Sequence, residues 1–186
     1  LAEALGSPHE ADSRGTAIVY APTRRSAEQE GERLARAGWP SAVYHAGLEP
    51  AARDAAQGAF ASGAARVIVA TNAFGMGIDR PDVRAVVHLA PPGSIEAYYQ
   101  EVGRAGRDGA PALGLLLVSA SDVPLRRRLL ELPTDGRLPE PETVRHKWGL
   151  FLELLRYAES GSCRHDAILR YFGDEAETLS GCGRCD

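Results

Sequence analysis

The chain has 186 residues, of which 44% are hydrophobic and 25% are charged, and its formal net charge is −4 at pH 7. This composition is typical of a soluble globular protein and excludes a surface that is basic throughout, so any contact with nucleic acid must be local. No apolar run approaches the length of a membrane span and no secretion signal is present, so we expect no membrane partner.

The predicted elements alternate between short apolar strands and helices. Residues 1–15 are polar and contain glycine and proline, which predicts a linker or an outer helix. The predicted strands cover 16–20, 42–45, 66–70, 85–89 and 113–118, and the predicted helices cover 26–37, 49–61 and 94–102. Such alternation predicts an α/β fold in which helices cover both faces of a parallel sheet.

Polar residues follow three of the predicted strands. They are Thr23-Arg24, His45-Ala46-Gly47 and Thr71-Asn72. Functional residues of parallel sheets gather at the carboxyl ends of the strands, so we expect a site at this edge.

The pattern changes near residue 120, which is the predicted domain boundary. Arg126-Arg127-Arg128 lies in a helical stretch, 133–141 is rich in proline and glycine, and 143–158 is predicted to be a long amphipathic helix. We therefore expect an α/β domain over residues 1–120 and a small, mainly helical subdomain over 121–186.

The glycine-containing segment 94–107 carries two arginines and a glutamine. At about 100° per residue, Gln100, Arg104 and Arg107 share one helical face if the helix continues through Gly103. Guanidinium groups that point the same way can clamp phosphate oxygens. A solvated basic face is the alternative, but glycine inside a helix costs about 1 kcal/mol relative to alanine, which suggests that close backbone approach is needed there.

Residues 69–79 form a predicted strand, a turn broken by glycines and an acid. Gly75 and Gly77 allow tight turning and leave backbone N–H groups free to meet a phosphate. Asp79 can hold a ribose hydroxyl or an arginine. An ordinary strand-to-helix turn with a capping aspartate is the alternative.

All three cysteines, Cys163, Cys182 and Cys185, lie in the last 24 residues. An odd, clustered set without a secretion signal favours a metal site over disulfides, although a C-x-x-C pair can also be a redox pair. Zinc takes four tetrahedral ligands, and His165 is a candidate for the fourth.

Several segments together resemble one family. VATNAFGMGIDRPDVRAVVH and YYQEVGRAGRDG resemble motifs V and VI of RecQ helicases, within helicase superfamily 2. AVYHAGL resembles the segment between motifs IV and V, and IVYAPTRRSAE resembles motif IV, where the family more often has cysteine at Ala21. YAESGSCRHDAILRYFGDEAETLSGCGRCD resembles the RecQ zinc module, with His165 in place of an arginine and Asp174 in place of a glutamate.

The resemblance covers residues 16–186 and implies a RecA-like second motor lobe followed by a zinc-binding subdomain. Arg107 would be the arginine finger on the γ-phosphate of ATP, with Arg104 beside it and Gln100 coupling the two lobes. The implied residues of the nucleotide cleft are Gly77 and Asp79. The residues implied to face single-stranded DNA are Thr23, Arg24, His45, Thr71 and Asn72.

The resemblance also implies the cofactors and the setting of the whole protein. ATP with Mg²⁺ would be bound mainly by a first lobe of the same polypeptide, because the only lysine, Lys147, is not in the Gly-Lys-Ser/Thr of a P-loop. The chain alone is therefore expected not to hydrolyse ATP. A structural Zn²⁺ would be held by the three cysteines and a fourth expected at position 188, beyond this chain.

The activity implied is that of an ATP-dependent 3′-to-5′ DNA helicase. It would act in repair and recombination, on single strands and duplex junctions, in the cytoplasm and with the nucleoid if the source is bacterial. One alternative is another superfamily 2 motor, such as an RNA helicase, which would not carry a zinc module here. A second alternative is a non-catalytic DNA-binding scaffold stapled by zinc.

Overall fold

The computed structural model describes residues 5, 15–75, 80–133, 136–174 and 182–185. The chain divides into two compact units, one formed by residues 1–90 and 100–117 and the other by residues 91–99 and 118–186. Among the described residues, no helix combines the length and the apolar character that crossing a membrane requires.

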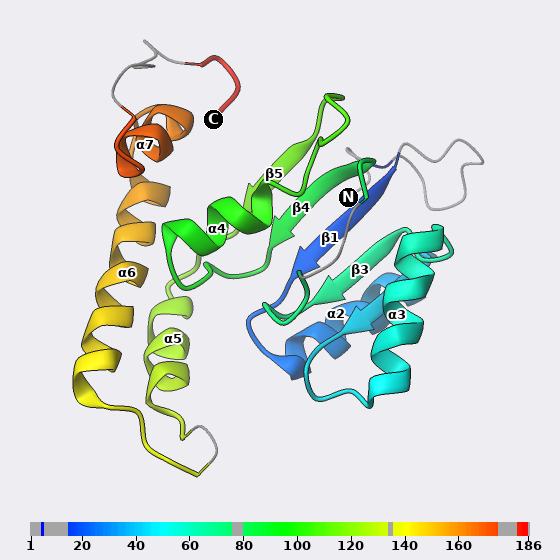
Figure 1. The fold of residues 1–186 in the computed structure, drawn as a ribbon, viewed down its shortest axis with the longest axis horizontal. Coiled ribbons are helices and arrows are strands. Elements are labelled where there is room, and N and C mark those ends of the chain that lie inside the picture. Colours follow the sequence, from blue (N-terminus) through cyan, green and yellow to red (C-terminus); the bar gives the residue numbers. More distant parts are fainter. Residues whose placement is uncertain (1–4, 6–14, 76–79, 134–135, 175–181, 186) are drawn as a thin grey trace. The chain divides into compact units, whose positions relative to one another are not determined.

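The first unit is built on a parallel sheet of five strands (Figure 1). The order across the sheet is β2-β3-β1-β4-β5, and all four pairings are parallel. The strands are β1 (Thr16–Tyr20), β2 (Ser41–Tyr44), β3 (Val67–Ala70), β4 (Val83–His88) and β5 (Leu113–Leu116). The prediction of a parallel α/β sheet is therefore confirmed, with every strand present and its ends shifted by at most two residues.

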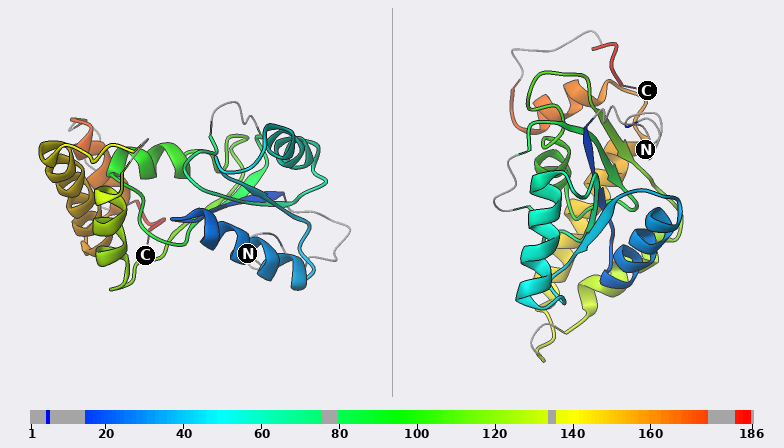
Figure 2. Two further views of the ribbon diagram at one scale, coloured as in Figure 1. Left: turned by 90° about the horizontal axis from the view of Figure 1, so that it is seen from below. Right: turned by 90° about the vertical axis from the view of Figure 1, so that its right-hand side faces the viewer.

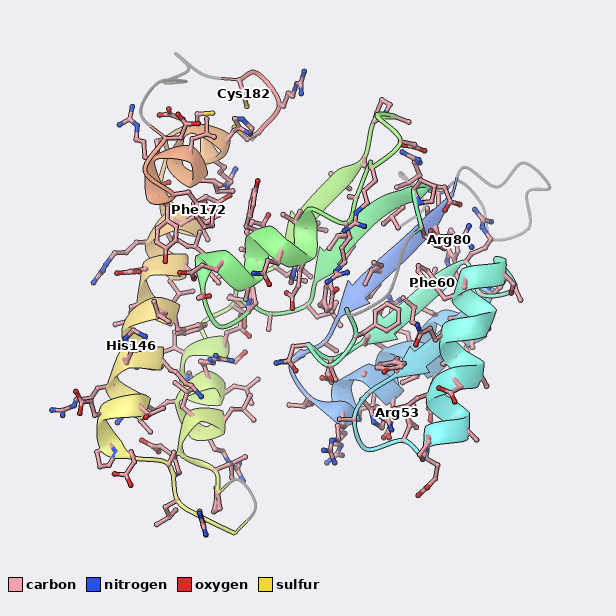
Figure 3. The ribbon with its side chains drawn as sticks, viewed as in Figure 1. Arg53, Phe60, Arg80, His146, Phe172 and Cys182 are labelled. Carbon is pink, nitrogen blue, oxygen red and sulfur yellow. The ribbon has the colours of Figure 1, made fainter. Side chains whose placement is uncertain are left out.

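Helices α2 (Arg24–Arg36) and α3 (Pro50–Ser62) cover opposite faces of this sheet (Figure 2). Successive side chains of a strand point to opposite faces. Val19 and Val69 accordingly pack in one buried cluster with Leu34 of α2. Ile18 and Ile68 pack in a second cluster with Phe60 of α3, whose ring is turned toward the sheet (Figure 3).

Helix α2 begins two residues earlier than predicted because Thr23 and Ser26 form a capping box. The Ser26 N–H donates to Oγ1 of Thr23 at 3.1 Å, and the Thr23 N–H donates to Oγ of Ser26 at 3.1 Å. These bonds satisfy N–H groups that have no partner in the first helical turn.

Helix α4 (Ile95–Val102) ends at Val102, as predicted, and does not continue through Gly103. Residues 103–108 form turns, and Gly106 takes a positive φ of 66° that favours glycine. The Gly106 N–H donates to the carbonyl of Val83 in β4 at 2.9 Å, which fixes the turn to the sheet. The condition for Gln100, Arg104 and Arg107 to share one helical face, a helix that continues through Gly103, is therefore not met.

The second unit is mainly helical, as predicted. It contains α5 (Asp122–Glu131), α6 (Pro141–Glu159) and α7 (Arg164–Tyr171), together with the first half of α4. Tyr98 of α4 lies 5.8 Å from Tyr157 of α6, measured between ring centroids, and Tyr99 lies 5.1 Å from Phe172. The Tyr171 hydroxyl donates to Glu96 at 2.5 Å, so aromatic and polar contacts join α4, α6 and α7.

Two helical glycines provide a matched test of the first unit. A Cβ at Gly31 of α2 would overlap the side chain of Val43 in β2, whereas a Cβ at Gly58 of α3 would meet open space. We expect Gly31→Ala to lower the free energy of unfolding by about 1–3 kcal/mol, the cost of overpacking. Gly58→Ala should raise it by about 0.5–1 kcal/mol through helix propensity. Urea denaturation measures both, and a stabilising Gly31→Ala would contradict the described packing of α2 on β2.

Candidate functional site

The carboxyl ends of four strands lie side by side at one edge of the sheet. The parallel register pairs Tyr44 with Ala70, Ala70 with Tyr20, and Tyr20 with His88. Beyond the strands, the Thr71 N–H donates to the carbonyl of Tyr44 at 3.2 Å. The polar residues that follow β1, β2 and β3 therefore gather at this edge, as the strand pattern predicted.

His45 lies at this edge but is turned into the protein. Its side chain is almost fully buried, and its Nε2 lies 3.1 Å from Oε1 of Glu28 on α2. Nδ1 is also buried and has no hydrogen-bond partner among the described residues. His45 therefore joins the end of β2 to α2, and its contact with DNA stays a prediction.

The other residues predicted to face DNA differ in exposure. Thr23 is half-buried and its hydroxyl caps α2, and Thr71 is buried. Arg24 and Asn72 are exposed. The Arg24 guanidinium lies against Gly47, where a Cβ would come within 2.9 Å of Nη1. Arg24 and Asn72 are thus the two that present polar groups to solvent at this edge.

Arg53 was missed by the sequence analysis. It lies near the start of α3, the helix that follows the loop after β2 (Figure 3). It is half-buried, and its Nε is buried without a hydrogen-bond partner in the described part of the chain. Its position one helical turn after the His45 loop was a usable signal, but an arginine among alanines also fits an ordinary solvated helix.

Arg104 is tied to the glycine turn that follows β3. Its Nη1 donates to the carbonyl of Gly75 at 2.8 Å, and a Cβ at Gly75 would come within 2.7 Å of its Nη2. Nearby, the Tyr20 hydroxyl donates to the carbonyl of Phe74 at 3.3 Å. Burial raises the pKa of Tyr20 to about 12, and the Arg104 charge partly opposes that rise. Arg104 therefore holds the turn in place from within the first unit.

His88 of β4 and Glu101 of α4 form a polar pair within the first unit. His88 is 1% exposed, and its Nε2 lies 2.8 Å from Oε2 of Glu101. The imidazole ring stacks on Tyr20, with the centroids 5.1 Å apart and the planes 18° apart. This pair joins the end of β4 to the last turn of α4, from which the arginine-bearing turn departs.

The remaining residues predicted for the nucleotide cleft are exposed or lie outside the described part. Gln100 and Arg107 are exposed, whereas Arg104 is half-buried. Gly77 and Asp79 lie outside the described residues. The two arginines thus have different surroundings, because only Arg104 is turned onto the Gly75 carbonyl.

The three cysteines converge in the second unit, and Figure 3 labels one of them, Cys182. The sulfur of Cys185 lies 3.5 Å from that of Cys182 and 3.7 Å from that of Cys163. Two sulfurs that each bind a tetrahedral zinc at about 2.3 Å are roughly 3.8 Å apart. The backbone N–H groups of Asp166 and Cys182 lower the pKa of Cys163 to about 7, which favours the thiolate that binds metal.

These cysteines fit zinc in both donor chemistry and spacing. His165, the candidate fourth ligand, is exposed and is not a member of this group of ligand atoms. Cys163 lies at the N-cap of α7, so a bound metal would join the start of that helix to the segment 182–185.

Comparisons of the sequence with known proteins agree with both parts of the chain. The family profile described as "Helicase conserved C-terminal domain" matches residues 1–109, and the profile described as "RecQ zinc-binding" matches residues 120–186. The ATP-dependent DNA helicase RecQ of Haemophilus influenzae is 42% identical over 171 residues, which cover 91% of this chain and 26% of that protein. RecQ of Bacillus subtilis is 37% identical over 169 residues, which cover 90% and 28%. The chain thus spans about a quarter of the length of these relatives.

A solved structure supports the fold. The C-terminal domain of the DEAD-box protein Dbp5 is similar with a TM-score of 0.53 and 22% identity, over 86% of this chain and 71% of that one.

The different surroundings of the two arginines predict different effects on stability. Arg104→Met removes a charged donor from the Gly75 carbonyl, and such bonds contribute about 1.5–3 kcal/mol to the free energy of unfolding. Arg107→Met changes an exposed side chain, so we expect the smaller loss. Urea denaturation measures the free energy of unfolding of both variants. Equal losses of this free energy would show that Arg104 does not stabilise the turn.

Proposed function

We propose that this chain, which belongs to the family of helicase conserved C-terminal domains as a RecQ-type second lobe with its zinc-binding part, is one part of an ATP-dependent DNA helicase. The full protein would move 3′ to 5′ and unwind DNA in repair and recombination. A first lobe of the same polypeptide would bind ATP with Mg²⁺. Sequence identities of 42% and 37% to two RecQ relatives, over about nine-tenths of this chain, support the proposed helicase activity.

The proposed catalytic group is Arg107, and the observation that carries this role is the anchored turn after α4. Gly106 is bonded to β4, so the residue that follows it leaves from a fixed point of the sheet. Arg107 is exposed, while Arg104 is engaged with Gly75. A permanently charged guanidinium there can stabilise the charge that develops on the transferred phosphoryl group.

The other parts of the nucleotide cleft complete the proposal. Arg104 would lie beside the finger and position the glycine turn, and Gln100 would couple the lobes. Gly77 and Asp79 would line the cleft from this side. The phosphoryl transfer itself needs the lysine of a P-loop, which this chain does not contain.

The proposed DNA track is the carboxyl edge of the sheet. Contacts to backbone phosphates at this edge would be salt-sensitive and independent of base sequence, as a translocating motor requires. Arg24 supplies an exposed charge there, and Asn72 an exposed amide. The full set proposed to face single-stranded DNA or a duplex junction is Thr23, Arg24, His45, Thr71 and Asn72.

We propose a structural role for zinc. Cys163, Cys182 and Cys185 supply three thiolates, and a cysteine at position 188 of the longer protein would supply the fourth. Metal bound there would fix α7 against the segment 182–185. Four protein ligands leave no open position for catalysis.

Arg107 can be tested in the full-length protein. Arg107→Ala should lower DNA-stimulated ATP turnover by about 10³–10⁵-fold, the range known for arginine fingers, because ground-state binding of ATP depends mainly on the other lobe. Arg128→Ala, which removes an exposed arginine of α5, is the matched control. Steady-state kinetics measure both. Turnover that survives Arg107→Ala, or robust hydrolysis by the 186-residue chain alone, would contradict the proposed division of the active site.

Zinc can be tested on the purified chain. We expect about one zinc per chain by elemental analysis, and loss of that metal in Cys163→Ser, because a zinc site needs its thiolates. Ser162→Ala changes the neighbouring exposed residue and should keep the metal. Circular dichroism should show less helix in the metal-free protein. A metal-free chain with unchanged helix content would overturn the structural role.

A further inference from the structure

Arg126 of α5 is a half-buried arginine with no anionic partner among the described residues. Its guanidinium lies 5.8 Å from the ring centroid of Phe151, and a Cβ at Gly93 would overlap it. Its Nε is buried, and the described residues give it no hydrogen-bond acceptor. Burial alone lowers its pKa, with no carboxylate acting in the opposite direction.

Other arginines of the same unit do have such partners. Arg127, the next residue, pairs with Glu131 at 2.6 Å, and Arg170 pairs with Asp166 at 3.0 Å. A guanidinium stays charged under all ordinary conditions, so partial burial without an anion is unfavourable. The guanidinium of Arg126 is therefore a suitable binding group for an anion from another molecule.

Gly93 shapes the place where this cation lies. With no side chain at residue 93, the guanidinium can rest directly on the backbone that leads into α4. Phe151 covers it from α6 and limits the directions in which it can point. Because the planar guanidinium is already held in place, it loses less conformational entropy on binding two oxygens of one phosphate than a mobile arginine would.

We propose that Arg126 binds a backbone phosphate of the DNA on which this chain acts. This inference rests on the proposed DNA binding by the chain. Gly93 follows the last residue of β4 by five positions in the sequence. The net charge of the chain is −4, so the chain as a whole does not attract DNA. Binding of DNA would therefore depend on individual cations such as Arg126.

The test measures DNA binding by the zinc-loaded 186-residue chain. Fluorescence anisotropy of a labelled oligothymidylate is recorded over a series of NaCl concentrations. Arg126→Gln should weaken binding and reduce the slope of log K against log[NaCl] by about 0.7, the value for one phosphate contact of a single strand. Arg127→Gln removes the same formal charge from an arginine already paired with Glu131, so its slope should match the wild type.

Two further variants separate binding from folding. Gly93→Ala keeps Arg126 but displaces its guanidinium, so it should weaken DNA binding in the same direction. Arg126→Met removes the half-buried cation and keeps an apolar stem on Phe151, so it should raise the melting temperature while DNA affinity falls. A residue that serves only the packing of α5 on α6 would give a lower melting temperature instead.

Three results would overturn the inference. Arg126→Gln and Arg127→Gln could weaken binding equally with unchanged slopes, which would leave the DNA track intact. A polyglutamate of equal charge could displace the oligothymidylate from the wild type but not from Arg126→Gln, which would assign Arg126 to an acidic protein. Absence of any binding at low salt would overturn both this inference and the proposed track.

Discussion

The parallel register of the sheet is the constraint on which the rest of the site depends. Because β2, β3, β1 and β4 are paired in parallel and in step, their carboxyl ends meet at one edge. Residues more than twenty positions apart in the chain, such as Tyr44 and Thr71, become neighbours there. Helices α2 and α3 begin at the same edge, which adds Arg24 and Arg53. A shift in register would separate these groups and remove the site.

Glycines give the two arginines after α4 their different surroundings. The helix ends at Val102, and Gly106 bonds to β4, so the chain turns back onto the sheet. Gly75 has no side chain, and the Arg104 guanidinium occupies that space. Tyr20, stacked on His88, supports the same turn through its hydrogen bond to the Phe74 carbonyl. Arg104 therefore stabilises the glycine turn, and Arg107 is exposed for the proposed contact with ATP.

The strands, and the gathering of polar residues at their carboxyl ends, could be predicted from the sequence. Short apolar runs that alternate with single helices fold in few ways other than a parallel sheet. The end of α4 at Val102 was predicted too, but the placement of Arg104 and Arg107 was not, since helical periodicity alone does not show that Gly106 bonds to β4. Burial of His45 on Glu28 was missed because the partners are 17 positions apart. The same holds for the surroundings of Arg126, which depend on where Phe151 and Gly93 lie. The local sequence pattern predicts helices and strands. Contacts between side chains that are far apart in the sequence can be found only from the folded structure.

Amide hydrogen exchange of this chain with and without a single-stranded oligonucleotide tests the central claim most directly. If the carboxyl edge of the sheet is the working face, bound DNA should slow exchange in residues 21–26, 45–50 and 71–75. The opposite edge, at residues 39–41, 64–66 and 80–83, should be unchanged. Slower exchange confined to that opposite edge would contradict the account, because the strand ends would then carry no part of the DNA contact.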